Sequence, residues 1–275
     1  MKSSTIFAVS TLWRPRSAAM AVKSTDIGLL PDGPPGPRRF KIKTADTQGL
    51  RGMVDNLLKS RYGWRGYRQV ALPTDQTVHR FTLAAIEREH TIGTITVGFD
   101  GEFGLSAEET FPDEVAEMRA AGRRLCEFTK LAIDPMVGSK RVLAALFHVA
   151  YIVAHRIRGH DTLLIEVNPR HAAYYQRMLG MRVLASGRIN RAVEAPSVLL
   201  TADFSYIMAQ IGEYGGQPER SDSRSLYPFA FTLHEEASIM SRLNKRQAYV
   251  DRQRAAVTQG PPSVPPSEFS STDIA

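Results

Sequence analysis

The sequence is poor in cysteine and has no long apolar run. Cys126 is the single cysteine among 275 residues, so one chain can form neither an internal disulfide nor a multi-cysteine metal site. A lone thiol fits a reducing compartment. Apolar stretches fall short of the roughly 18 residues that a membrane-spanning helix needs, and the apolar segment 5–13 is followed at once by arginines rather than by a signal-peptide cleavage site. We therefore expect a cytoplasmic protein with no transmembrane segment.

Two further kinds of site lack their usual sequence signal. His148 and His155 have no carboxylate or cysteine at metal-binding spacing, which favours helix-face residues over metal ligands. No histidine–aspartate arrangement is visible that would activate Cys126, so we expect a buried, inert thiol. The arginine-containing segments form no basic stripe along a reading helix, and a nucleic-acid partner is not expected.

The composition that is present describes a folded, basic protein. Apolar residues make up 43% of the chain, enough for a packed core. The formal net charge is +7, which favours an anionic partner such as an acidic protein, a phosphorylated cofactor, nucleic acid or a membrane surface. A solvated basic surface without any partner would have the same charge.

Proline and glycine mark the two ends of the folded part. The segment LLPDGPPGPRR precedes Arg39, and TQGPPSVPPSEFSSTDIA closes the chain; neither composition supports a helix or a strand ladder. We predict a disordered leader over residues 1–38, a single domain with a C-terminal helical extension over 39–254, and a disordered tail over 255–275.

Between these limits, hydrophobic periodicity predicts alternating strands and helices. The predicted strands cover residues 39–43, 78–87, 91–100, 123–133, 162–167, 181–189 and 195–203. The predicted helices cover Gln48–Lys59, a segment from about Pro112, Ser139–Arg158, residues 168–180 and a segment from about Glu235. The order β-α-β-β-α-β-α-β-α-β-β indicates an α+β protein.

The strand CEFTKLAID carries two charged residues, Glu127 and Lys130, among apolar ones. Both faces of the strand are mostly apolar, so it is expected near the centre of the sheet, where an ionised carboxylate is costly unless it is paired or faces a cleft. A regular strand would point the two side chains apart, whereas a β-bulge would bring them to one side, and bulges are common beside active sites. The alternative is a structural pair between Glu127 and an arginine of a neighbouring strand.

The turn after this strand is a candidate anion site. Gly138, Ser139, Lys140 and Arg141 precede or open the long helix, where free N–H groups and two cations attract negative charge. The pattern lacks the full glycine spacing of a nucleotide-binding loop, so an ordinary capped helix fits it as well.

Several motifs together resemble a known family. SRYGWRGY, TIGTITVGFD, RRLCEFTKLAID, VNPRHAAYYQRMLGM and RAVEAPSVLL occur in one order over roughly residues 45–245. They resemble the long-chain N-acyl amino acid synthases of the GNAT acyltransferase superfamily, which are relatives of the acyl-homoserine lactone synthases. The resemblance implies a GNAT-like mixed, mostly antiparallel central sheet with splayed strands 4 and 5 and helices on both faces.

The resemblance also implies a donor site in the gap between the splayed strands, which takes up the pantetheine arm of the acyl donor. The residues it assigns to donor binding are Leu131, Ile133, Gly138, Ser139, Lys140, Arg141 and Asn168.

Catalytic and acceptor roles follow from the same resemblance. Glu127 is expected to act as the base that takes a proton from the acceptor amine, with Lys130 holding it ionised or binding the acceptor's carboxylate. Tyr175 is expected near the departing sulfur, where core packing is the alternative role. A backbone N–H near Leu131 would stabilise the oxyanion. The loop residues Trp64, Arg65 and Tyr67 are expected to cover the acceptor.

The donor is expected to be the acyl-phosphopantetheine of acyl carrier protein, or acyl-CoA, with no permanently bound cofactor. The turn MVGSKRV keeps one glycine and adds two cations, which suits a single phosphodiester and an acidic carrier protein better than a pyrophosphate. The predicted activity is therefore transfer of a long-chain fatty acyl group to the α-amine of an amino acid. An acetyl-CoA-dependent N-acetyltransferase and a non-catalytic GNAT-like binding module remain as alternatives.

Overall fold

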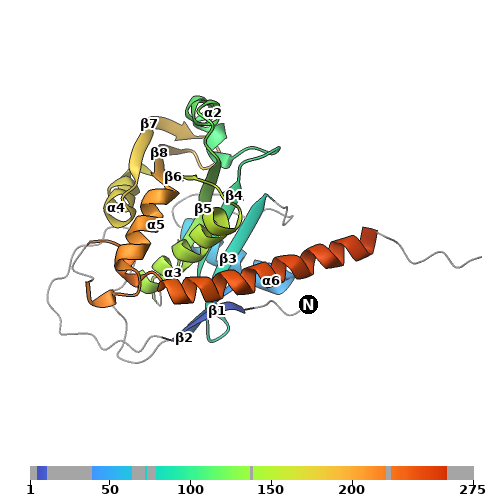
Figure 1. The fold of residues 1–275 in the computed structure, drawn as a ribbon. Helices are drawn as coiled ribbons and strands as arrows, with labels where there is room; N and C mark the ends of the chain where they lie inside the picture. Colours follow the sequence, from blue (N-terminus) through green and yellow to red (C-terminus); the bar gives the residue numbers. More distant parts are fainter. Residues whose placement is uncertain are drawn as a thin grey trace, which may run out of the picture.

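The chain folds around one mixed sheet (Figure 1). The computed structural model describes residues 5–10, 39–63, 72, 79–136, 139–220 and 224–258 of the 275. The strands are β1 (Thr5–Ser10), β2 (Arg39–Thr44), β3 (Arg80–Glu87), β4 (His90–Phe99), β5 (Leu125–Ile133), β6 (Thr162–Val167), β7 (Arg182–Asn190) and β8 (Ala195–Asp203).

The eight strands lie in the order β1-β2-β3-β4-β5-β6-β8-β7. The β5–β6 pair is parallel and the other neighbouring pairs are antiparallel. The predicted α+β class with a mixed, mostly antiparallel sheet is confirmed.

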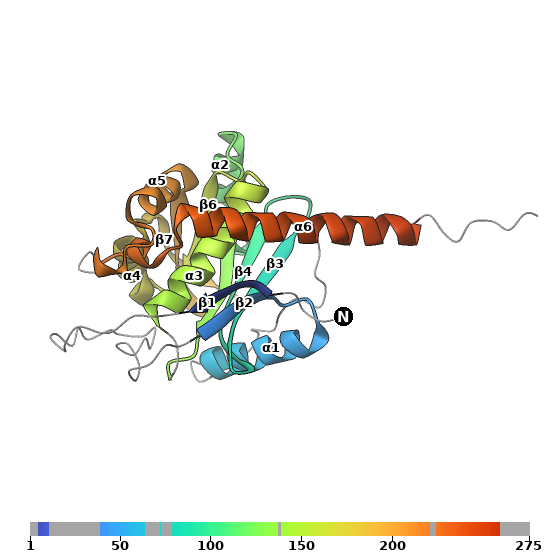
Figure 2. The ribbon, with the colours of Figure 1, turned by 60° about the horizontal axis from the view of Figure 1, so that its bottom comes forward.

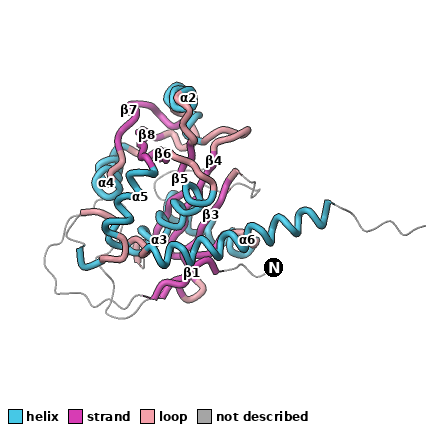
Figure 3. The backbone as a smooth tube through the Cα atoms, viewed as in Figure 1, coloured by secondary structure: helices cyan, strands magenta, loops and turns pink. Residues whose placement is uncertain are grey.

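Helices cover both faces of the sheet (Figures 2 and 3). The α-helices are α1 (Gln48–Gly63), α2 (Pro112–Ala120), α3 (Lys140–Tyr151), α4 (Pro169–Leu179), α5 (Phe204–Tyr214) and α6 (Leu233–Thr258). The shorter turns are η1 (Ser106–Glu109), the π-helical η2 (Ile152–Ile157), η3 (Pro218–Arg220) and η4 (Tyr227–Phe229). None of the described helices is both long and apolar enough to cross a bilayer.

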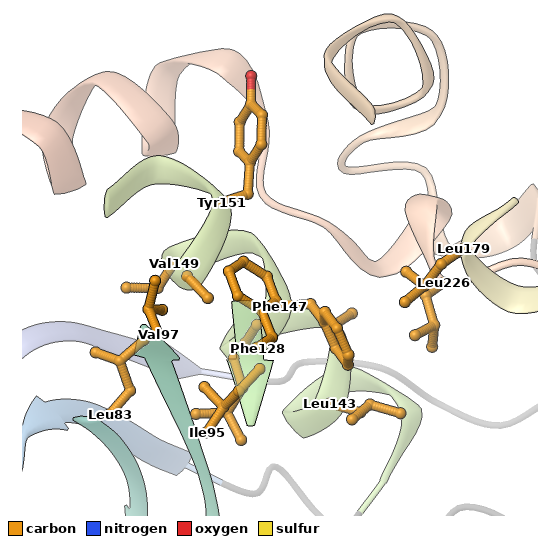
Figure 4. Close-up of a cluster of buried hydrophobic side chains, with 14 of the residues drawn as sticks. Leu83, Ile95, Val97, Phe128, Leu143, Phe147, Val149, Tyr151, Leu179 and Leu226 are labelled. Carbon is orange, nitrogen blue, oxygen red and sulfur yellow. The ribbon is translucent and has the colours of Figure 1, made fainter. Parts of the chain in front are cut away.

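Three hydrophobic clusters define these layers. On one face, α1 packs its buried residues on Ala84 and Ala132 of the sheet, and α2 packs Val115 against the buried Leu125 and Leu164. On the other face, α3, α4, α5 and α6 share the largest cluster with the inward side chains of the strands (Figure 4). Residues 142–151 of α3 are all buried, so this helix forms the centre of the molecule.

Local capping residues mark where α3 and α4 begin and where α4 ends. The Ser139 hydroxyl accepts the Val142 N–H and begins α3, and the Asn168 side chain accepts the Arg170 N–H and begins α4. Gly180 ends α4 in the left-handed region at φ +69°. Ser139 and Asn168 thus begin the two helices at the first residues of their predicted ranges.

The helix predicted over Ser139–Arg158 is not α-helical throughout. It changes at Ile152 into a π-helical turn, in which the Arg158 N–H bonds the carbonyl of Val153, five residues back. The carbonyl of His160, just beyond this turn, bonds Nδ1 of His155. The hydrophobic periodicity of the sequence predicts neither this π-helical turn nor the contact between His155 and His160.

The predicted ends of the domain need correction. Residues 5–10 were expected in a disordered leader, but they form β1 and pair with β2 at the edge of the sheet. The expected disordered tail from 255 is wrong for residues 255–258, because α6 continues to Thr258. Helix α5 was not anticipated at all.

Candidate active site

Strands β5 and β6 separate part way along their length. They pair at three positions only, Leu125 with Thr162, Cys126 with Leu163 and Glu127 with Leu164. Beyond Glu127, β5 runs on to Ile133 and β6 to Val167 without pairing with each other. These are the strands numbered 4 and 5 in the prediction, and the predicted splay is present.

A cavity of about 410 Å³ fills the gap between the two strands. Its walls include residues 128–133 of β5 and 165–168 from the end of β6. Further lining residues come from both helical layers: His171 and Tyr175 of α4 on one face, and Arg61, Tyr62, Arg80, Ser106 and Glu109 on the other. The cavity is therefore lined by residues from both faces of the sheet.

A β-bulge interrupts β5 inside this cavity. Thr129 pairs with Thr96 and Ala132 with Thr94, so Lys130 and Leu131 together oppose one residue of β4. Lys130 has φ +50°, in the left-handed region. The bulge lies where the spacing of Glu127 and Lys130 suggested one, and the charges of Arg80 and Glu127 both act on the pKa of Lys130.

The Glu127 carboxylate is buried and held by the η1 turn. The residue is 3% exposed. Its Oε1 accepts the Ser106 N–H at 2.9 Å and its Oε2 accepts the Ala107 N–H at 3.0 Å. Burial raises the pKa of Glu127, and the bonds from Ser106 and Ala107 and the positive charge of Arg80 offset part of that rise. A raised carboxylate pKa suits a general base.

Arg80, Gly98 and Glu127 lie in one row across the sheet. Arg80 of β3 pairs with Gly98 of β4, which pairs with Glu127 of β5. A Cβ at Gly98 would stand 2.8 Å from Cγ and Oε1 of Glu127. The missing side chain therefore makes room for the carboxylate. Arg80 lies two strands away from Glu127 and lowers the pKa of the carboxyl through its charge, so it is not the paired arginine of a neighbouring strand that the alternative expected.

The environment of Lys130 disfavours its charged form. Burial lowers its pKa, the positive charge of Arg80 lowers it further, and Glu127 and Asp55 oppose these effects. Arg80 stands beside Glu127 as well. The charge of Arg80 favours the ionised form of Glu127, an effect that the sequence prediction assigned to Lys130 as one of two possible roles.

The remaining predicted site residues fall into three groups. Leu131, Ile133, Asn168 and Tyr175 line the cavity, and the Leu131 carbonyl accepts the Tyr62 hydroxyl at 2.6 Å. Ser139, Lys140 and Arg141 open α3 outside the cavity lining, with Arg141 half-buried near Glu235. Gly138, Trp64, Arg65 and Tyr67 lie outside the described residues.

Sequence reasoning missed part of the cavity. Glu166 of β6 accepts the Asn190 amide at 2.8 Å and the Ser197 hydroxyl at 2.6 Å. Its place in the apolar strand TLLIEV is the same kind of signal as that of Glu127 and could have been used. No such signal marks Ser106 or Arg80 in the sequence, because only folding brings these residues towards Glu127.

The described part of the chain contains neither a cluster of candidate metal ligands nor an exposed cysteine. No three histidine, cysteine or acidic residues gather there as a metal-binding group. Cys126 is buried, as expected, and burial followed by the charge of Glu127 raises the pKa of its thiol.

The splayed strands, the bulge and the cavity lined from both faces of the sheet define a GNAT-type acyltransferase. The sequence profile of the family "N-acyl amino acid synthase FeeM" matches residues 53–203. The chain belongs to this family and is an N-acyltransferase.

The solved structure of FeeM has the same fold. The structure of FeeM, an N-acyl amino acid synthase from uncultured soil microbes, superimposes with a TM-score of 0.55 at 23% identity, over 61% of this chain and 92% of that one. The acyl-homoserine lactone synthase LasI gives 0.43 at 14% identity, over 60% and 89%. ElaA of Escherichia coli gives 0.44 at 6% identity, over 59% and 97%. No curated protein matches the chain in sequence.

Proposed function

We propose that this protein transfers a long-chain fatty acyl group from acyl carrier protein to the α-amine of an amino acid. The observation that carries the proposal is the wedge between β5 and β6, which holds a cavity of about 410 Å³ next to the buried Glu127. Pockets for small organic ligands have volumes in the range of roughly 300–1,000 Å³.

The donor arm would lie in the wedge. Residues 128–133 of β5 line the cavity and are not paired with β6 there. An extended pantetheine arm carries amides that can pair with such a strand edge, as an added strand would. The thioester would then lie at the level of the bulge, with Glu127 on one face of the sheet and Tyr175 on the other.

Aminolysis of the thioester then needs two proton transfers. The neutral amine attacks the carbonyl carbon, a C–N bond forms, and the carbonyl electrons move to oxygen, where a backbone N–H near Leu131 stabilises the charge. The proton released by the amine goes to Glu127. The C–S bond breaks, and the departing thiolate takes a proton from Tyr175.

The charges on the α1 face favour an amino acid as acceptor. Arg61, Arg80 and Lys130 line that end of the cavity. Cations inside a partly dry cavity bind a carboxylate strongly and leave its α-amine directed at the reaction centre. The acceptor is therefore an amine that carries its own carboxylate.

The preference for a long acyl chain rests on a second, apolar cavity. Phe128 lines both the main cavity and a smaller one of about 30 Å³. The smaller cavity is bounded by α3, α5 and η4 through side chains such as Phe147, Ile207 and Tyr227. An alkyl chain that displaced the Phe128 ring would pass from the main cavity into this apolar space.

The preference for a carrier protein rests on charge. The chain has a net charge of +7, with Lys140 exposed at the start of α3. An acidic carrier protein would be steered towards such a surface. Coenzyme A would need a glycine-rich turn for its pyrophosphate, and this chain has one glycine there.

Donor competition tests the proposal. Purified protein is incubated with a mixture of amino acids and, in separate reactions, with hexadecanoyl carrier protein, hexadecanoyl-CoA or acetyl-CoA, and the products are identified by mass spectrometry. We expect long-chain N-acyl amino acids, formed fastest from the carrier protein. Acetyl transfer without long-chain product would overturn the proposal. In Glu127→Gln turnover should fall about 10²-fold or more while carrier binding persists.

A further inference from the structure

The proposed base is buried and does not itself line the cavity. Glu127 is 3% exposed and is not among the residues that line the cavity, whereas its bonding partner Ser106 is. An acceptor amine inside the cavity therefore meets Ser106 before it meets the carboxylate. This arrangement raises the question of how the amine's proton reaches Glu127.

Ser106 faces the carboxylate with its backbone and its side chain. Its N–H donates to Oε1 of Glu127 at 2.9 Å, and its hydroxyl is close enough to the carboxylate to help lower the pKa of Glu127. A hydroxyl can accept one proton while it donates another, which a backbone N–H cannot do. The hydroxyl is thus the one group of this contact that can carry a proton from the cavity to Glu127.

The position of Ser106 does not depend on its own side chain. The Ala107 N–H anchors the same turn to Oε2 of Glu127 at 3.0 Å. The Glu108 carboxylate accepts the Leu105 N–H at 3.0 Å and is itself bound by Arg119. Arg119 also binds Asp100 at the end of β4. Removal of the hydroxyl should therefore leave the turn in place.

We propose that Ser106 is a catalytic proton relay between the acceptor amine and Glu127. When the amine attacks the thioester, its N–H bond breaks and the proton moves to Oγ of Ser106. In the same step the hydroxyl proton of Ser106 moves to a carboxylate oxygen of Glu127. One bond to hydrogen breaks and one forms at each of the two transfers, and no further reactant is needed. The relay rests on the proposed function of Glu127 as the base.

Three variants separate the relay from a structural role. Ser106→Ala keeps both backbone N–H bonds to Glu127 and removes the hydroxyl alone. Ser106→Thr restores a hydroxyl at the same place. Ser197→Ala is the matched comparison, because it removes a cavity hydroxyl that is bonded to the other carboxylate, Glu166.

Single-turnover rates and solvent isotope effects are measured for each protein, with thermal melting to verify folding. In Ser106→Ala we expect the rate to fall about 10²-fold with little change in the KM for the donor, and Ser106→Thr to recover most of it. In mixtures of light and heavy water, the wild-type rate should fall along a curve, quadratic in the deuterium fraction, because two protons move in the same step. For Ser106→Ala the plot should be a straight line, as for one moving proton, and Ser197→Ala should keep the curved plot of the wild type.

The outcomes separate the relay from the function on which it rests. A wild-type rate in Ser106→Ala, or a one-proton dependence in the wild type itself, overturns the relay whether or not any variant folds. If the wild-type protein transfers no acyl group, the proposed function fails instead. If Glu127→Gln is active and Glu166→Gln is not, the base is Glu166 and the relay through Ser106 is overturned with it.

Discussion

Glu127 combines burial with an environment that still tolerates its charge. Moving a carboxylate out of water favours its neutral form. Two backbone N–H groups and the nearby Arg80 favour the ionised form. The balance leaves the pKa of Glu127 above the ordinary value for glutamate, so the group can accept a proton readily when the amine attacks.

This balance predicts the pH dependence of the reaction. The base works only when it is ionised, so kcat should fall as the pH drops through the pKa of Glu127, at a pH above the ordinary range of a glutamate. Rate profiles are compared for wild type and Glu127→Gln. The variant should lack this acidic limb and keep the limb that belongs to the amine. An identical profile for the two proteins would contradict the assignment.

Gly98 should be intolerant of any side chain. The methyl group of Gly98→Ala would stand 2.8 Å from Cγ and Oε1 of Glu127, so the carboxylate has to move from its bonds to the η1 turn. We expect kcat to fall about 10²-fold because the base is displaced, with a loss of about 1–3 kcal/mol in the free energy of unfolding from overpacking.

The matched control for this variant is Gly52→Ala on α1, where a Cβ meets nothing within 4 Å. It should raise the free energy of unfolding by about 0.5–1 kcal/mol, because alanine loses less conformational entropy than glycine in a helix. Its turnover should equal that of the wild type. Full activity in Gly98→Ala would show that the row of Arg80, Gly98 and Glu127 does not position the base.

At the scale of elements, the β5 bulge combines a strained backbone with a change in the direction of its side chains. Lys130 adopts φ +50°, a conformation that costs a non-glycine residue about 1–2 kcal/mol. In return the bulge ends the regular alternation of β5, and the charge of Glu127 acts on the pKa of Lys130. Residues held in such conformations concentrate at functional sites.

Two substitutions at Lys130 should separate backbone strain from charge. Lys130→Gly and Lys130→Ala both remove the ammonium, so both should raise the KM for the amino acid. Lys130→Gly also relieves the strain and should unfold with a free energy about 1 kcal/mol above that of Lys130→Ala. Urea denaturation of the pair measures the difference. Equal stabilities would mean that the bulge is not strained in solution.

At the scale of the whole molecule, the segment after residue 203 packs on the same face of the sheet as α3 and shares its hydrophobic cluster. It lies beyond the part matched by the family profile. A buried hydrogen-bond network attaches it to α3: Nδ1 of His148 accepts the Phe231 N–H at 2.9 Å, and Nε2 faces Glu236 at 3.2 Å. Arg156 binds the same carboxylate at 3.0 Å. Beyond this network α6 runs past the edge of the sheet (Figure 1).

Glu236 should therefore contribute to stability at neutral pH. Burial alone would raise its pKa, but His148, Arg156 and His155 outweigh burial and lower it. Because the folded pKa is depressed, this stabilisation is present above the ordinary pKa of a glutamate and is lost as the pH falls through the folded value. In Glu236→Ala the buried His148 loses a partner, at a cost of about 1–3 kcal/mol.

Chemical denaturation at several pH values tests this prediction, with the exposed Glu219→Ala as the control. The stability difference between wild type and Glu236→Ala should shrink at acidic pH, while Glu219→Ala should follow the wild type throughout. A difference that is independent of pH would mean that packing, rather than the charge of Glu236, attaches α6.

Prediction from sequence succeeded where the signals are local. The caps at Ser139 and Asn168 and the hydrophobic periods located most helices and strands, and the charged pair in β5 indicated the bulge. It failed for β1, whose partner β2 lies far along the chain, and for the η1 turn, whose purpose appears only when it meets Glu127. The roles of the predicted site residues stay predictions, including those of Trp64, Arg65 and Tyr67.

By itself the sequence determined the class of fold, the order of most of its elements and a costly carboxylate in a central strand, because periodicity, capping and burial costs act between near neighbours. Only the tertiary structure decided that the pairing of β5 with β6 ends at Glu127, that Ser106 bonds that carboxylate while the charge of Arg80 acts on it, and that the cavity is lined from both faces of the sheet. These features depend on the packing of segments tens of residues apart, and no local pattern of side chains records that packing.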